Sequence, residues 1–234
     1  QLGDKFERDI RREYRFRNDD VVTAYVTKIG TEVLRTLGQQ PLEYRFYVVE
    51  NKEINAFAAP AGHIYVHTGT ILRVRNVSEL AGVIAHEIGH VTHRHIAQNY
   101  EKQRAASVGR QAAVICAGIL GGGAAAGAAN LATGMGLSAV LNSFGREAER
   151  ESDDFAVEAL PAAGYDPSGL PSFFETLVAE DGPRPPPFLS SHPAPAARLQ
   201  TTRAVIAAQD PPPGPKLDDN GRLELTPRPI PLPT

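Results

Sequence analysis

The chain has 234 residues, of which 42% are hydrophobic and 22% are charged, a composition typical of an ordinary globular domain with a substantial core. The formal net charge is −3, so the sequence lacks the basic field expected of a nucleic-acid-binding protein. The single cysteine, Cys116, excludes an intramolecular disulfide and leaves the redox compartment open. No basic or long apolar leader follows Gln1, so we expect either a cytosolic protein or one whose targeting segment was removed.

The amino-terminal part of the sequence predicts two helices followed by two strands. Residues 4–17 are highly charged and carry an apolar side chain every fourth residue, which is typical of a short surface helix. Apolar residues then recur with helical period from Val22 to Leu37. Alternation from Leu42 to Val48 predicts a strand, and the run His63–His67 predicts another. We interpret the intervening stretch, Asn55–Pro60, as a turn or an irregular segment.

A long central helix is predicted to follow these strands. Asn76 and Glu79 have the spacing of a capping box, and the helical pattern continues to about residue 103. A second helix is predicted over residues 144–162, where Gly164 stops it.

Two shorter helices are predicted near the carboxyl-terminal end of the domain. Asp166 and Pro167 are suited to the N-cap and first position of one of them, which continues through Leu177. The last helix is expected to begin at Ser191-His192-Pro193 and to run through Ile206.

Two segments differ in composition from the rest of the chain. Residues 112–140 are rich in Ala and Gly, and we expect a mobile or cleft-covering segment there rather than a membrane span, because strongly apolar side chains are few. A peripheral membrane contact stays an alternative. Residues 210–234 are rich in proline and are predicted to form an extended tail. We therefore expect one domain over residues 1–209.

The motif with the clearest chemistry is His86-Glu87-Ile88-Gly89-His90. Residues four apart on a helix share one face, so the imidazoles of His86 and His90 can reach a single zinc ion. Glu87 points beside that ion, where its carboxylate can take a proton from water. A chance occurrence of the pattern is the alternative, and its position within a capped helix argues against that alternative.

A catalytic zinc ion needs a third protein ligand and an open fourth position. The best candidates lie in residues 146–153, where Glu149 and Asp153 are four apart and share a helix face, so one can bind the metal while the other orients a ligand by hydrogen bonding. Glu147 and Glu151 are competing ligands. The spacing alone is equally compatible with a solvated charged helix.

The sequence resembles the zinc metallopeptidase family that includes the CAAX prenyl endopeptidase and the bacterial heat-shock protease HtpX, and within it the soluble, periplasmic branch. Four blocks carry the resemblance in the family's order and spacing. They are Asn55-Ala56-Phe57-Ala58 with Gly62-His63-Ile64-Tyr65-Val66, the run from His86 to His95, Glu149 to Asp153 with Phe155-Ala156, and Ser191-His192-Pro193 with Arg198-Leu199.

The resemblance implies a mainly helical α+β zincin-like domain, with a small mixed or antiparallel sheet beside the helix of His86. It implies that Glu149 is the third ligand of one zinc ion per chain and that Asp153 supports the site by hydrogen bonding. It also places His192 and Arg198 near the metal. His192 is expected either to donate to the oxyanion of the reaction or to occupy the open zinc position in a resting state. A helix-capping role for His192 is the plain alternative.

Four further histidines receive no ligand role. His93 and His95 do not continue the stripe of His86 and His90, so we expect them to be surface groups or to lie behind the ligands. His63 and His67 are interpreted as structural or substrate-side residues on the second strand.

These observations predict a zinc-dependent endopeptidase in which Glu87 is the catalytic base. An extended polypeptide is expected to add as a further strand beside the strand of Ile64, which suits unfolded or partly folded protein substrates. The predicted substrate-binding residues are Asn55, Ala56, Phe57, His63, Ile64 and Tyr65.

Two other functional classes stay open. The first is a latent or non-proteolytic chaperone or assembly factor that retains the zinc site, and the second is a zinc hydrolase acting on an amide outside proteins. The resemblance implies the periplasm or envelope of a bacterium, a role in protein quality control, and a possible contact with outer-membrane assembly or the membrane surface. It gives no oligomeric state.

Overall fold

The computed structural model describes residues 2–17, 20–102, 104–105, 144–180 and 186–209. The predicted Ala/Gly-rich segment, 112–140, and the predicted tail, 210–234, lie outside these residues. The described helices and strands, in chain order, are α1 (Leu2–Glu13), α2 (Asp20–Arg35), β1 (Arg45–Val49), β2 (Ala56–Ala59), β3 (His63–His67), α3 (Thr68–Arg73), α4 (Val77–Thr92), α7 (Arg146–Ala163), α8 (Gly169–Ala179), α9 (Pro187–Ser191) and α10 (Pro195–Ala207).

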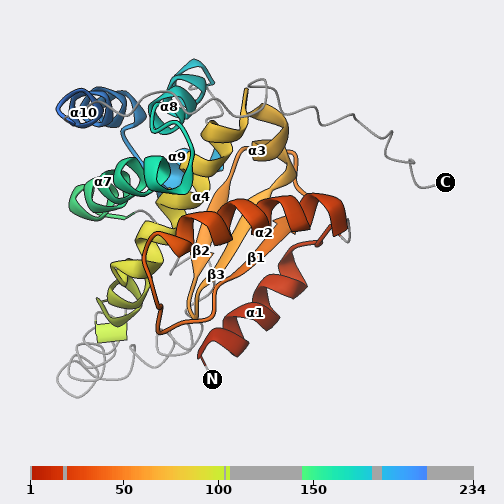
Figure 1. The fold of residues 1–234 in the computed structure, drawn as a ribbon. Helices are drawn as coiled ribbons and strands as arrows, with labels where there is room; N and C mark the ends of the chain where they lie inside the picture. Colours follow the sequence, from red (N-terminus) through yellow and green to blue (C-terminus); the bar gives the residue numbers. More distant parts are fainter. Residues whose placement is uncertain (1, 18–19, 103, 106–143, 181–185, 210–234) are drawn as a thin grey trace, which may run out of the picture.

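The sheet is small and mixed, as the sequence predicts. Its strand order is β1-β3-β2, with β1 parallel to β3 and β2 antiparallel to β3. All five residues of β3 are buried, which suits a central strand. The helices outweigh the strands, so the domain has the expected α+β architecture (Figure 1).

The segment Asn55–Pro60 was predicted to be irregular, and this prediction is wrong. Ala56–Ala59 forms β2, which joins β3 through a tight connection containing Ala61 and Gly62, both at positive φ. Three of the four residues of β2 are alanines, whose intrinsic strand preference is low, so the cross-strand pairing decides the conformation.

The expectation that substrate adds beside the strand of Ile64 is also wrong. Both edges of β3 are already paired, because β1 lies on one side and β2 on the other. The other edge of β1 contacts the preceding segment through a bridge between Phe16 and Val49. Among the described residues, β2 is therefore the strand whose outer edge is not paired with another strand.

Different helices cover the two faces of this sheet. On one face, α2 packs on β1 and α4 packs on β2, as Figure 1 shows. Gly30 allows this close approach of α2, because a Cβ atom there would lie 2.1 Å from the Phe46 ring. The opposite face carries stacked aromatic rings, with Tyr65 between Tyr47 at 4.9 Å and Phe57 at 5.0 Å. The Arg11 guanidinium of α1 lies over the Tyr47 ring.

Helix α4 is the centre of the domain. The predicted cap is confirmed, because the Asn76 side chain accepts a hydrogen bond of 2.9 Å from the Glu79 amide. Every residue from Ser78 to Val91 is buried. The predicted continuation to residue 103 is wrong at one point, because α4 ends at Thr92 and Arg94 adopts φ 60° before helical structure resumes at His95. This break changes the direction of the chain directly after the motif.

The remaining helix boundaries differ from the predictions by a few residues. Gly164, at φ 93°, ends α7 as predicted. Helix α8 begins at Gly169 rather than at Pro167, and the Asp166 side chain accepts a hydrogen bond from the Ser168 amide in the turn before it. The last helix begins at Pro195, after Ala194 at φ 62°.

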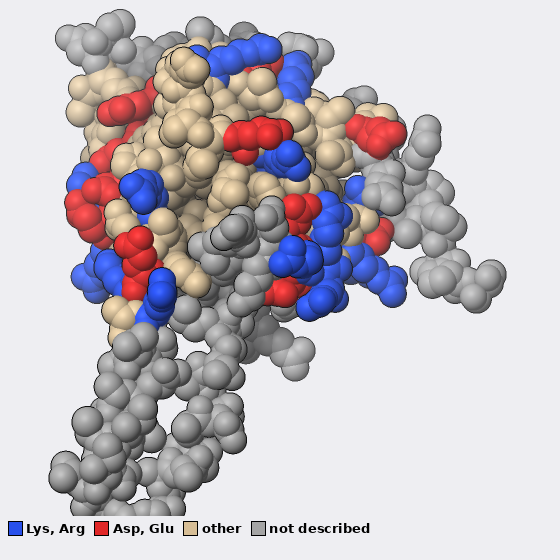
Figure 2. Space-filling view, turned by 90° about the horizontal axis from the view of Figure 1, so that it is seen from below, with Lys and Arg blue, Asp and Glu red and all other residues tan. Residues whose placement is uncertain are grey.

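The surface carries charges of both signs. On the face seen in Figure 2, basic and acidic side chains are intermixed rather than gathered by sign. In the described parts of the chain, we find no helix that combines the length and the apolarity needed to cross a membrane.

His67 makes the stability of the fold dependent on pH. Its ring is 1% exposed and lies near those of Tyr14 and Phe57. Burial lowers the pKa of His67 from 6.5 to about 4, and Glu53 opposes this only in part. Because the unfolded chain takes up this proton at a higher pH than the folded chain, the contribution is complete above about pH 6.5 and is lost as pH falls toward 4.

We therefore expect proton uptake by His67 in the unfolded chain to lower the free energy of unfolding by about 2 kcal/mol between pH 7 and pH 5. Urea unfolding of the metal-free protein at both pH values measures this loss. The His67→Leu variant should lose about 2 kcal/mol less over the same interval. Equal losses in the two proteins would contradict the assignment.

Candidate metal centre

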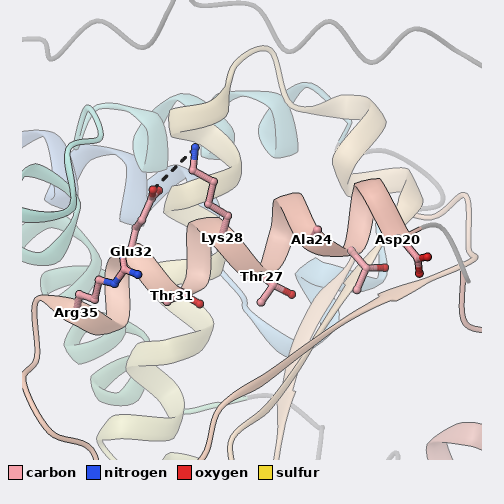
Figure 3. Close-up of a pocket in the computed structure, with 8 residues that line it drawn as sticks. Asp20, Ala24, Thr27, Lys28, Thr31, Glu32 and Arg35 are labelled. Carbon is pink, nitrogen blue, oxygen red and sulfur yellow. Dashed lines mark ion pairs between the residues drawn. The ribbon is translucent and has the colours of Figure 1, made fainter.

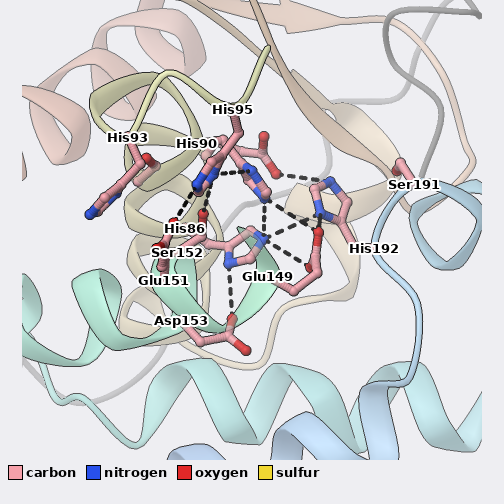
Figure 4. A network of polar contacts seen from close by, with 12 residues as sticks. His86, His90, His93, His95, Glu149, Glu151, Ser152, Asp153, Ser191 and His192 are labelled. Atoms are coloured by element: carbon pink, nitrogen blue, oxygen red, sulfur yellow. Dashed lines mark hydrogen bonds and ion pairs between the residues drawn. The ribbon is translucent and has the colours of Figure 1, made fainter. Parts of the chain in front are cut away.

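The motif histidines converge as their helical spacing predicts. His86 and His90 lie one turn apart on α4, and both are fully buried. Their Nε2 atoms are 3.0 Å apart (Figure 4). One small group can therefore contact both imidazoles.

Glu149 of α7 completes this cluster. Its carboxylate oxygens lie 3.5 Å from the Nε2 atom of His86 and 3.5 Å from that of His90. The two competing carboxylates are held elsewhere: Glu147 forms a surface ion pair with Arg150, and Glu151 contacts His95. The structure thus brings Glu149, and neither competitor, to the motif histidines.

A fourth side chain, that of His192, enters from the segment between α9 and α10. Its Nδ1 atom lies 3.0 Å from Glu149 Oε1 and 3.2 Å from His86 Nε2. Its Nε2 atom lies 3.4 Å from Glu87 Oε1. The ring stacks on Phe188, with the centroids 4.4 Å apart. His192 therefore fills the space between the motif and Glu149.

The donor set fits a zinc ion. One ligand atom from each of His86, His90, Glu149 and His192 can be chosen so that all lie within 4.8 Å of one another, and all four residues are buried. The separations given above range from 3.0 to 3.5 Å. Ligand atoms at 2.0–2.1 Å from a tetrahedral zinc would be separated by about 3.3 to 3.4 Å. Imidazole nitrogen and carboxylate oxygen are also the atoms that zinc prefers.

Asp153 and Arg198 support the cluster from behind. Asp153 Oδ1 lies 2.9 Å from Nδ1 of His86. Arg198 donates two hydrogen bonds to Asp153, at 2.8 and 2.6 Å, and its Nη1 lies 2.5 Å from Glu149 Oε2. The Arg198 guanidinium also lies over the ring of Phe174. Both residues therefore lie where the sequence predicts them, beside the ligand candidates.

The charges of the site are strongly coupled. Burial alone would raise the pKa of Glu149, but His192, His86 and His90 outweigh it and hold that pKa well below its ordinary range. Burial also opposes ionisation of Asp153, and Arg198 outweighs it, so the pKa of Asp153 is lowered. The carboxylates are therefore ionised at neutral pH.

The two motif histidines differ in protonation. Burial is the main cause that lowers the pKa of His90 far below its ordinary value, so this imidazole is neutral. Burial and Arg198 also lower the pKa of His86, but Asp153 and Glu149 outweigh them and raise it to about 9 in the metal-free protein. A metal ion therefore competes with a proton for His86.

Glu87 is buried beside the cluster without being part of it. Among the described residues, neither oxygen of its carboxylate accepts a hydrogen bond. The Nε2 atom of His192 faces this carboxylate, 3.4 Å from Glu87 Oε1. An acceptor group so placed is suited to take up a proton from a molecule that enters the site.

The predicted substrate-binding residues do not form one group. Phe57 and Tyr65 belong to the aromatic stack, and Tyr65 also approaches His63. Ile64 is fully buried in the core. Asn55 and Ala56 lie at the start of β2, where the Ile54 carbonyl accepts a hydrogen bond from the Phe188 amide. The part of β2 near the His192 segment is thus its amino-terminal end.

Two aromatic residues of the site were not among those predicted from the sequence. Phe144 stacks on His90 with the ring centroids 4.0 Å apart, and Phe188 stacks on His192. The Phe144 amide donates to the Ser191 carbonyl, which joins the start of α7 to the His192 segment. Neither residue lies in a recognisable motif, so periodicity and spacing contained no signal for them.

A separate pocket lies along α2, away from these groups in the sequence. Figure 3 shows its lining, which includes the Lys28 and Glu32 ion pair. Its lining residues are Asp20, Thr23, Ala24, Thr27, Lys28, Thr31, Glu32 and Arg35. None of them is a predicted site residue.

Residues 21–206 match peptidase family M48. The chain belongs to this family. It is 33% identical over 209 residues to the beta-barrel assembly-enhancing protease of Escherichia coli strain K12, covering 87% of this chain and 42% of that protein. It is 31% identical to the metalloprotease LoiP of the same organism, covering 78% of this chain and 70% of that protein.

A more distant similarity extends to a eukaryote. The chain is 30% identical over 153 residues to the mitochondrial metalloendopeptidase OMA1 of Arabidopsis thaliana, covering 65% of this chain and 30% of that protein. The members of family M48 are zinc metallopeptidases, and the buried donor set of this chain suits one such ion. The resemblance inferred from the sequence blocks is thereby confirmed, and zinc is the cofactor.

The approach of α7 to α4 depends on Gly89 within the motif. A Cβ atom at Gly89 would lie 3.0 Å from Ser152 Cα and 3.1 Å from the Phe155 ring. We expect Gly89→Ala to displace α7, and with it Glu149, and to weaken zinc binding about tenfold. Competition with a chromogenic chelator measures the zinc affinity.

Gly82 provides a matched control on the same helix. A Cβ atom at Gly82 would lie 2.9 Å from the Leu170 backbone, so Gly82→Ala strains the contact with α8 rather than with α7. We expect this variant to have a lower Tm but a nearly unchanged zinc affinity. Equal zinc affinity in the two variants would contradict the role given to Gly89.

Proposed function

We propose that this chain is a zinc-dependent endopeptidase, with His86, His90 and Glu149 as the metal ligands and Glu87 as the catalytic base. The observation that carries the proposal is the position of Glu87. Its buried carboxylate has no hydrogen-bond donor among the described residues and directly follows a ligand candidate in the sequence. Membership of peptidase family M48 supports the reaction class.

The chain's own residues divide the chemistry between them. A bound zinc ion supplies Lewis acidity, which lowers the pKa of water and polarises a peptide carbonyl. Glu87 then takes up the proton of the attacking water and returns it to the leaving amine. Asp153 accepts from His86 Nδ1–H and so directs Nε2 of that ring toward the cluster. Arg198 keeps the carboxylate of Asp153 ionised and forms an ion pair with that of Glu149.

His192 supports a closed resting state. Its Nδ1 atom lies close to Glu149 and to His86, as a fourth ligand would, and its Nε2 atom faces Glu87. A substrate carbonyl needs the same space, so we propose that His192 withdraws before turnover. This position favours the resting-state role of His192 over the oxyanion role, and it keeps a latent form of the enzyme as the second candidate function.

Extended or misfolded polypeptides are the proposed substrates. We propose that they align with the outer edge of β2, at Asn55, Ala56 and Phe57, rather than with β3.

Protein quality control in the bacterial envelope is the proposed role, supported by relatives named beta-barrel assembly-enhancing protease in Escherichia coli and Vibrio cholerae. The chain spans 42% of the length of these relatives, so a contact with outer-membrane assembly is likewise a proposal. The family match over residues 21–206 supports a peptidase domain within residues 1–209.

Replacement of Glu87 separates metal binding from catalysis. Glu87→Gln keeps the size of the side chain and removes its basicity, so we expect zinc content to stay at one ion per chain. Turnover of fluorescent casein should fall by about 10²- to 10⁴-fold. The control is Glu147→Gln on the exposed surface of α7, which should be as active as the unchanged protein. Casein turnover by Glu87→Gln at the control's rate would exclude Glu87 as the base.

Replacement of His192 distinguishes its two proposed roles. If His192 closes the site, His192→Ala should raise kcat/KM for a short peptide several-fold and weaken zinc binding, because one ligand is lost. Ser191→Ala, at the neighbouring position, is the control. A kcat that falls by about 10²-fold or more in His192→Ala would instead support the oxyanion role.

A further inference from the structure

His95 lies against the motif although sequence spacing separates it from the ligand stripe. The left-handed conformation of Arg94, at φ 60°, turns the chain back after α4. The His95 side chain is consequently buried, with 4% exposure, and its Nδ1 atom lies 3.1 Å from Nδ1 of His90 (Figure 4). This contact engages the nitrogen of His90 that does not face Glu149.

Glu151 engages the other nitrogen of His95. Its Oε2 atom lies 2.8 Å from His95 Nε2, and its side chain is 40% exposed. Glu151 follows Glu149 by two residues on α7, so the two carboxylates leave that helix in different directions. One reaches the cluster directly, and the other reaches it through His95.

The hydrogen-bonding capacity of these groups determines the proton positions. An ionised carboxylate only accepts, so Nε2 of His95 carries the proton donated to Glu151. With its one ring proton on Nε2, the imidazole of His95 presents a lone pair on Nδ1 to Nδ1 of His90, 3.1 Å away. His90 must then donate from its own Nδ1–H, which leaves the Nε2 atom of His90 without a proton. That atom is the one that faces Glu149.

The opposite arrangement is incompatible with metal binding. If His95 donated from Nδ1, a neutral His90 would have to accept at Nδ1 and carry its proton on Nε2. A protonated Nε2 cannot coordinate a cation. The Ser152 hydroxyl, at 3.4 Å from His95 Nδ1, is a longer contact than the one with His90 and does not replace it.

We propose that Glu151 and His95 form a positioning relay that fixes the tautomer and orientation of His90 for the metal. The relay is the counterpart of Asp153, which contacts His86 directly. His95 and Glu151 touch neither the metal nor the substrate in this proposal, so both are positioning residues. The proposal rests on the zinc site proposed above. It adds that the partly exposed carboxylate of Glu151 acts through His95 to set the zinc affinity of the buried His90.

Packing is the competing explanation for a buried His95. Its ring stacks on that of His93, with the centroids 5.5 Å apart and an interplanar angle of 13°. A phenylalanine would maintain such stacking and would lack the acceptor atom. A glutamine would supply a carbonyl oxygen in place of the Nδ1 lone pair. These two substitutions therefore separate packing from hydrogen bonding.

The test measures zinc affinity by chelator competition in the metal-free full chain, with circular dichroism and Tm to verify folding. We expect His95→Phe to bind zinc about 10- to 100-fold more weakly and His95→Gln to recover part of the loss. Glu151→Ala should weaken binding in the same direction, whereas Glu147→Ala, two residues before Glu149, should not. The double variant His95→Phe/Glu151→Ala should bind no more weakly than His95→Phe alone.

Three outcomes would overturn the relay. They are an unchanged zinc affinity in His95→Phe, an unchanged affinity in Glu151→Ala, and additive losses in the double variant. If His95→Phe does not fold, the partly exposed position of Glu151 makes Glu151→Ala the deciding variant. If the unsubstituted protein binds zinc but does not cleave casein, that result would count against the proposed function and not against the relay.

Discussion

The close packing of α7 on α4 is the constraint on which the site depends. It places Glu149 and Asp153 against His86 and His90 in an interior where all four side chains are nearly or fully buried. Ionised carboxylates are costly to bury unless cations and hydrogen bonds compensate them. Arg198 compensates part of this charge, and a divalent cation between the imidazoles and Glu149 would compensate much of the rest. The packing that buries the carboxylates therefore leaves negative charge that a bound metal cation would compensate.

The outer groups of the site divide into polar side chains behind the ligand candidates and aromatic rings stacked on the histidines. Asp153 and Arg198 lie behind His86 and Glu149, while Phe144 and Phe188 stack on His90 and His192 respectively. Hydrogen-bonded partners behind metal ligands fix ring orientation and tautomer. Residue His192 connects the two groups, because it touches Glu149 on one side and Glu87 on the other. The closed site is thus compatible with an enzyme that is held inactive until a substrate displaces one side chain.

The sequence was sufficient to predict the chemistry because local spacing controls it. Helical period alone places His86 and His90 on one face, and Asn76 marks the start of that helix. Spacing could not choose Glu149 over Glu147 and Glu151, since the choice depends on how α7 is rotated against α4. The family resemblance implies Glu149 as the third ligand, and the structure brings its carboxylate to the motif histidines.

The missed features depend on contacts between distant segments. Ala56–Ala59 has little strand preference of its own and becomes a strand through pairing with β3. The path of the chain after α4 depends on the positive φ of Arg94. Positive φ is uncommon for residues other than glycine, so an arginine in the sequence does not indicate it. His95 therefore appeared peripheral by spacing although it contacts His90.

Anomalous diffraction at the zinc absorption edge, from crystals of the zinc-loaded protein, tests the central claim most directly. The account predicts one peak per chain, about 2.0 to 2.2 Å from the Nε2 atoms of His86 and His90 and from a carboxylate oxygen of Glu149. A peak elsewhere, or one that leaves Glu149 outside bonding distance of the ion, would contradict it.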